Sequence, residues 1–172
     1  MKIVNIKKCT MKIEHLEGHI NSYKKSIETV VEKKILWQTK TRNLLLKTLN
    51  TIVKKYDIGW RVQELSWINT NEAVNITLDS FPSELLEKTN KIPTYQFIPG
   101  GALVFSQSYS GDITIFTLYP IQENLSNITN DEDLEIYTPE SIDEKLIVEK
   151  VDDFLKKMIK WEVPVIKNKV GF

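Results

Sequence analysis

The two histidines, His15 and His19, are spaced so that they lie on one face of a helix. Such a pair can bind a metal ion, and Glu14 and Glu17 lie close by in the sequence. A zinc site needs three or four protein ligands, however, and there is no third histidine, while the single cysteine, Cys9, precedes His15 by six residues. We interpret the pair as solvent-exposed helical histidines and predict neither a metal site nor a general base.

A second group of residues that could bind a ligand or take part in catalysis lies between residues 99 and 109. Pro99-Gly100-Gly101 could bind an anion through its backbone amides, but no GxGxxG or P-loop pattern surrounds it and a strand follows it. The polar segment 106–109 lacks the GxSxG elbow of a serine nucleophile. We therefore interpret the glycines as a tight bend and the polar residues as cross-strand hydrogen-bonding groups. The alternative, a small-molecule or enzyme site, would use Gly100, Gly101, Ser106, Gln107 and Tyr109.

The other polar clusters do not match a catalytic or metal-binding pattern. The acidic run at 131–135 lacks the spacing of a calcium loop. Cys9 has lysine neighbours that could lower its pKa and make it reactive, but we do not predict a role for it. We therefore predict no cofactor and favour a non-enzymatic protein.

Residues 10–56 are predicted to form a long basic amphipathic helix, or a helical hairpin. Apolar residues from 13 to 30 alternate at spacings of three and four, the repeat of a coiled-coil seam. Unbroken, the helix would be roughly 70 Å long, so it either projects and pairs with another chain or folds back near residues 38–41. A helix that packs only on its own core is the competing interpretation. The residues that we call the seam are Ile13, Leu16, Ile20, Tyr23, Ile27, Val30 and Trp37.

The net charge of zero conceals a division along the chain. Residues 1–56 contain 13 Lys and Arg against 4 Asp and Glu, whereas residues 57–172 contain 10 against 19. A basic helix and an acidic body can attract each other, within one chain or between subunits. The alternative is that the helix binds nucleic acid or another polyanion. Its contacts would then be Lys24, Lys25, Lys33, Lys34, Lys40 and Arg42.

The rest of the chain indicates an antiparallel sheet and a second helix. Alternating and β-rich segments predict four to five strands in meander order over 60–121, with a hairpin turn at Ser110-Gly111-Asp112. The strands around this turn have apolar residues at consecutive positions, so we expect both sheet faces to be covered, by helices or by another subunit. An acidic loop is predicted over 122–137. Thr138 as N-cap and Pro139 as first residue predict a C-terminal helix over 138–163, packed on the sheet.

These features predict one α+β domain over residues 1–172. A single cysteine suits a reducing compartment, and we expect no signal peptide, no membrane association and a cytoplasmic protein. The function we predict is a protein-interaction module or small accessory subunit that self-associates, or binds a protein partner, through the N-terminal helix. Polyanion binding and an unrecognised small-molecule or enzyme site are the alternatives.

Overall fold

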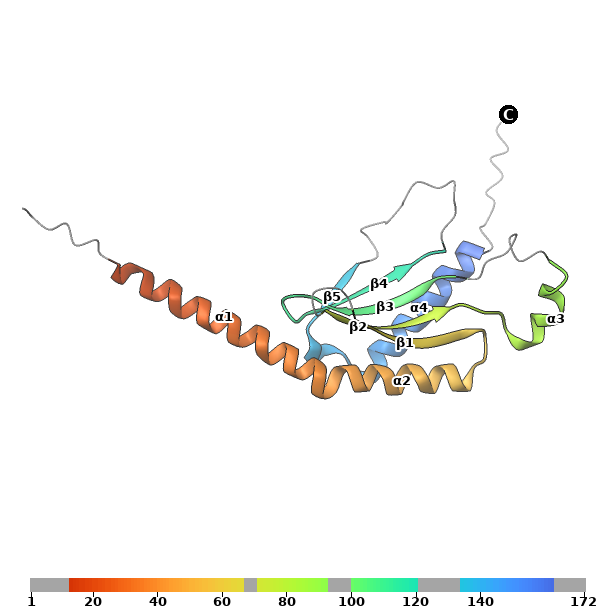
Figure 1. The fold of residues 1–172 in the computed structure, drawn as a ribbon, viewed down its shortest axis with the longest axis horizontal. Coiled ribbons are helices and arrows are strands. Elements are labelled where there is room, and N and C mark those ends of the chain that lie inside the picture. The colour runs from red at the N-terminus through yellow and green to blue at the C-terminus, as the bar shows by residue number, and fades with distance from the viewer. Residues whose placement is uncertain (1–12, 67–70, 93–99, 121–133, 163–172) are drawn as a thin grey trace, which may run out of the picture.

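In a computed structural model, the protein has the predicted α+β fold: a long N-terminal helix, a five-stranded antiparallel meander and a C-terminal helix (Figure 1). The structure describes residues 13–66, 71–92, 100–120 and 134–162. Predictions that fall elsewhere, such as the role of Cys9, lie outside the described residues.

The N-terminal helical segment is continuous and does not form a hairpin. It begins with a 3-10 turn at Glu14–Leu16, continues as α1 (Glu17–Leu36), passes through a π-helical segment, η2 (Trp37–Thr41), and ends as α2 (Arg42–Lys55). α2 lies along the sheet, whereas most of α1 extends beyond the rest of the protein (Figure 1). We call the sheet, together with α2 and the C-terminal helix α4 (Glu144–Glu162), the body.

The sheet has the strand order β1-β2-β3-β4-β5, with every neighbouring pair antiparallel. Its first four strands are β1 (Trp60–Ser66), β2 (Glu72–Leu78), β3 (Ala102–Gln107) and β4 (Ile113–Leu118). The predicted hairpin turn joins β3 to β4, where the Ser108 amide donates to the Asp112 carbonyl oxygen. A short helical stretch, η3 (Ser83–Leu85) followed by α3 (Leu86–Thr89), comes after β2.

The fifth strand lies in the segment that the sequence predicts as loop. β5 (Glu135–Tyr137) pairs with β4, and Tyr137 lies opposite Ile113 in the register. Only three residues form this strand, too few for an alternating pattern to be detected in the sequence. The strand is held in addition by side-chain interactions, because Lys150 of α4 contacts both carboxylate oxygens of Glu135 at 2.7 Å.

The C-terminal helix begins later than its sequence predicts. Pro139–Ser141 forms an isolated 3-10 turn, η6, and α4 covers Glu144–Glu162. Thr138 makes no side-chain cap, whereas Asp143 accepts a hydrogen bond from the Leu146 amide at 2.7 Å, as a helix N-cap does. The cause of the interruption is Ile142, which has an extended backbone and is buried in the core.

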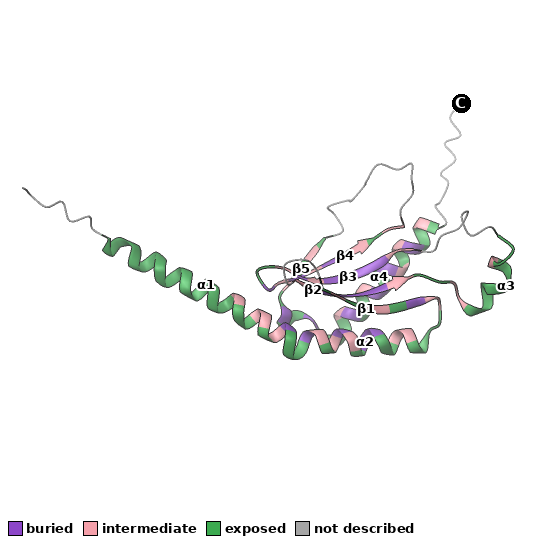
Figure 2. Cartoon of the chain, in the orientation of Figure 1, coloured by how far each residue is buried: buried purple, intermediate pink, exposed green. Residues whose placement is uncertain are grey.

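Both α2 and α4 pack on the same face of the sheet, where the main core lies. It contains Leu45 and Leu49 of α2, Ile147 and Phe154 of α4, and inward-facing strand residues such as Phe105. The other face has a small cluster of Ala73, Ala102 and Val104, with Leu65 and Phe116 beside it. Among the described residues no helix contributes to that cluster, so the alternative of helices on both faces is not what the structure shows. Buried residues are concentrated between the sheet and these two helices (Figure 2).

Candidate interaction helix

The projecting part of the N-terminal helix exposes its apolar seam. Five seam residues, Ile13, Leu16, Ile20, Tyr23 and Ile27, are between 43% and 65% exposed. α1 contains no buried residue, and its surface is exposed along most of its length (Figure 2). A regular row of large apolar side chains is therefore open to solvent over several helical turns.

The seam meets the body at its C-terminal end. The turn between β3 and β4 lies against this part of the helix, where Lys33 Nζ and Asp112 Oδ1 are 2.6 Å apart. Lys34 Nζ lies 5.2 Å from the centre of the Tyr109 ring, a cation–π contact. Hydrogen bonding from Lys33, the largest cause, holds the pKa of Asp112 below its usual value. Opposite charges thus attach the basic helix to the acidic body at this point.

Gly111 allows the turn to approach the helix closely. Its φ is +85°, in the left-handed region that favours glycine. A Cβ atom at this position would lie 2.6 Å from Cβ of Lys33 and 3.3 Å from the carbonyl oxygen of Val30. Any side chain here would therefore both strain the turn and push it away from the helix.

A second attachment joins the helix to the start of β2. Trp37 is fully buried, and its indole Nε1 donates to Glu72 Oε2 at 2.9 Å. Gln38 Nε2 donates to the same oxygen at 2.9 Å, and Arg42 Nη1 lies 3.5 Å from it. The hydrogen bond from Trp37 is the largest influence on Glu72, whose pKa lies below its usual value.

The π-helical segment η2 separates the projecting helix from the packed one. The wider turn brings Trp37 and Thr41, four residues apart, toward the body, and both are buried. The Thr41 hydroxyl donates to the Pro139 carbonyl oxygen at 3.3 Å. In the sequence, polar residues interrupt the seam register near this segment and indicate that the helix changes its packing partner. The same polar residues fit either a π-helix or the reversal of the chain at 38–41 that we considered.

The basic residues proposed as polyanion contacts do not gather on one face. Lys33, Lys34 and Arg42 interact with the body through Asp112, Tyr109 and Glu72 respectively. The other three, Lys24, Lys25 and Lys40, are exposed. Polyanion binding by these residues stays an untested prediction.

The residues proposed as a pocket are dispersed along β3. Gly101 precedes the strand and Tyr109 follows it, at opposite ends. Gly101 has a φ of +106°, and a Cβ there would lie 2.5 Å from Sδ of Met158, which explains the glycine as a tight bend against α4. Gly100 lies beside Pro120. Ser106 and Gln107 are successive strand residues and so face opposite sides of the sheet; Gln107 is buried, and its Nε2 has no hydrogen-bond partner among the described residues.

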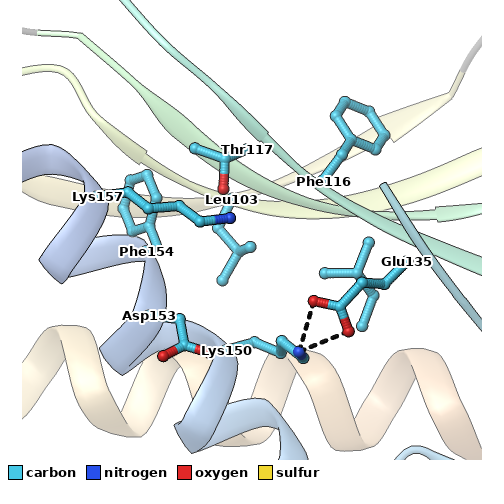
Figure 3. Close-up of a pocket in the computed structure, with 9 residues that line it drawn as sticks. Leu103, Phe116, Thr117, Glu135, Lys150, Asp153, Phe154 and Lys157 are labelled. Atoms are coloured by element: carbon cyan, nitrogen blue, oxygen red, sulfur yellow. Dashed lines mark hydrogen bonds and ion pairs between the residues drawn. The ribbon is translucent and has the colours of Figure 1, made fainter. Parts of the chain in front are cut away.

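A small pocket lies elsewhere, between β3, β4, β5 and α4 (Figure 3). Its lining includes Leu103, Phe154 and the ion pair of Glu135 with Lys150. Burial raises the pKa of Glu135, but hydrogen bonds from Lys150 and Tyr137 outweigh it, so this pKa lies below its usual value. The pocket volume of about 20 Å³ is enough for about one water molecule, so we assign it no ligand.

His15 and His19 are exposed near the free end of the helix. Within the described ranges no three His, Cys, Asp or Glu residues cluster as a metal site would require. None of the helices described here combines the length and apolar character needed to cross a membrane.

No protein-family model, curated protein or solved structure matches this chain.

Proposed function

We propose that this protein is an interaction module that self-associates through its N-terminal helix. The observation that carries the proposal is the exposed row from Ile13 to Ile27 on a helix that projects from the body. Contiguous apolar surface of this kind marks interaction sites in soluble proteins. The heptad spacing fits a helical partner, because a coiled-coil seam is buried by the seam of another helix.

The attachment of the helix to the body supports the same function. Trp37 is buried and hydrogen-bonded to Glu72, and Lys33 pairs with Asp112, so two contacts hold the base of the projection. A helix that is anchored in this way presents its seam in a defined direction. Ordering the helix before binding reduces the entropy lost when a partner binds.

The direct test is the mass of the protein in solution, by light scattering coupled to size exclusion, for the protein and for the double variant Ile20→Glu/Ile27→Glu. Burying an Ile side chain contributes about 1.5–3 kcal/mol, and a buried carboxylate would oppose association. We expect an oligomer for the protein and a monomer for the variant.

The matched control is Asn21→Glu/Thr29→Glu, which adds the same two charges to the outer side of the same helix. It should remain oligomeric, and circular dichroism should show that both variants keep their helices. An oligomer that survives in Ile20→Glu/Ile27→Glu would contradict the proposal. The ratio of absorbance at 260 and 280 nm in the same runs tests the polyanion prediction, since bound nucleic acid would raise it.

A further inference from the structure

We propose that the seam binds the seam of a second copy of this chain in antiparallel orientation, an inference that rests on the self-association proposed above. The two bodies then lie at opposite ends of a two-helix rod. Three relationships within the chain favour this arrangement over a parallel one.

The first relationship is steric. The body itself occupies the last part of the seam, where Trp37 is buried and the turn at Gly111 lies against Val30. Lys34, the next position in the seam register, has its ammonium group over the Tyr109 ring. A parallel second copy would continue as helix past this level, because its own helix extends to Lys55. Its helix would therefore need the space that the turn between β3 and β4 already fills.

The second relationship is the match of lengths. An antiparallel partner places its Val30 opposite Ile13, its Ile27 opposite Leu16 and its Tyr23 opposite Ile20, and symmetry repeats each pair. The overlap is roughly 26 Å long at 1.5 Å per residue. In the described part of the chain, the helix of the second copy begins at Glu14, which this pairing places level with the turn at Gly111. The exposed seam is thus covered over its whole length.

The third relationship is charge. Glu17 and Lys24 each directly follow a seam residue, Leu16 and Tyr23, and so border the seam on the same side. Antiparallel pairing brings Glu17 of each copy near Lys24 of the other, which makes two attractive pairs. A parallel pair would instead place Lys34 against Lys34 in the seam, and His19 opposite Lys24. Flanking charges of this type determine helix orientation in coiled coils.

Disulfide cross-linking tests the orientation. In a Cys9→Ser background, we would introduce Leu16→Cys and Ile27→Cys separately and together, and oxidise each protein under mild conditions. A disulfide needs Cα atoms within about 7 Å. In the antiparallel pair, two copies of residue 16 are roughly 16 Å apart along the axis, whereas residues 16 and 27 of different copies are level with each other.

We expect covalent dimers from Leu16→Cys/Ile27→Cys, and from a mixture of the two single variants, but not from either single variant alone. Covalent dimers of Leu16→Cys alone would overturn the antiparallel arrangement and leave self-association standing. An uncross-linked dimer in every sample would overturn it too, since the pairing would then lie elsewhere. A monomer by light scattering before oxidation would instead refute the proposed function.

Discussion

Lys33 of the projecting helix and Asp112 of the turn between β3 and β4 are 79 residues apart in the sequence and form a 2.6 Å ion pair. Both side chains are about four-fifths buried, and the pair lies where the seam passes from solvent into the body. It is one of the contacts through which the basic N-terminal helix interacts with acidic residues of the body. The seam before it is open, and the helix after it is packed.

Removing this pair should loosen the base of the helix without unfolding the protein. We expect Lys33→Met and Asp112→Asn each to lower the free energy of unfolding by about 1 kcal/mol or less, because partly solvated ion pairs contribute little. Hydrogen exchange of the amides around Lys33 should accelerate in both variants. Urea denaturation of the single and double variants gives the coupling energy, and a coupling of zero would show that the pair does not hold the helix.

Gly111→Ala should lower the free energy of unfolding more than the addition of a single methyl group suggests. The positive φ and the 2.6 Å approach to Lys33 Cβ predict a loss of about 1–3 kcal/mol in the free energy of unfolding. Gly18→Ala is the matched control, because a Cβ at Gly18 would meet no atom within 4 Å. That substitution should raise helix stability by about 0.5–1 kcal/mol. Equal effects of the two substitutions on thermal unfolding would contradict this account of the turn.

Acid should weaken the attachment of the helix to the body. The pKa values of Glu72 and Asp112 lie below their ordinary values of 4.5 and 3.8, chiefly through hydrogen bonds from Trp37 and Lys33 respectively. A carboxyl whose native pKa is lowered stabilises the fold above its unfolded pKa, and this stabilisation is lost as the pH falls through the native pKa.

We therefore expect the contribution of Glu72 and Asp112 to the free energy of unfolding to be constant above about pH 5 and to decrease below about pH 4.5. The fluorescence of Trp37 should report the loosening, by comparison with Trp37→Phe. In Glu72→Gln, the acid-induced decrease in the free energy of unfolding should be smaller than in the unmodified protein. An unchanged acid profile in that variant would show that Glu72 contributes nothing to it.

Charge reversal at the border of the seam should discriminate the two orientations independently of cross-linking. In the antiparallel pair, Glu17→Lys turns two attractive contacts into repulsive ones. Each attraction or repulsion is about 0.2–0.5 kcal/mol, and because each contact loses the attraction and gains the repulsion, dimerisation should weaken about tenfold at low salt. Lys24→Glu should do the same, and the double reversal Glu17→Lys/Lys24→Glu should restore the affinity. Sedimentation equilibrium measures all three, and failure of the double variant to recover would argue against the antiparallel pairing.

Much of the fold can be predicted from the sequence, because its long elements have strong periodicity. The seam spacing predicts a helix through Val30, and the hairpin around Gly111 is evident from its turn residues. Short or interrupted elements are harder to predict. β5 has three residues, and the start of α4 depends on the burial of Ile142, a tertiary contact that outweighs the local signal at Thr138 and Pro139.

The residues of the candidate site can be predicted from the sequence, but their exposure to solvent cannot. The apolar row from Ile13 to Ile27 can be identified by its spacing alone. Spacing cannot show whether that row packs on its own sheet or projects into solvent, because both arrangements use the same pattern. Nor can it show that η2 is a π-helix, or that Trp37 in this segment donates to Glu72, a residue 35 positions away.

The most direct test of the account is the solution mass of the protein at low and high salt. The monomer has a mass of 20.0 kDa, and an antiparallel pair would have twice that mass. We predict that the dimer persists at high salt, because apolar burial along the seam supplies most of its stability. A monomer at every concentration up to the millimolar range would contradict self-association through Ile13 to Val30 and, with it, the function proposed for this helix.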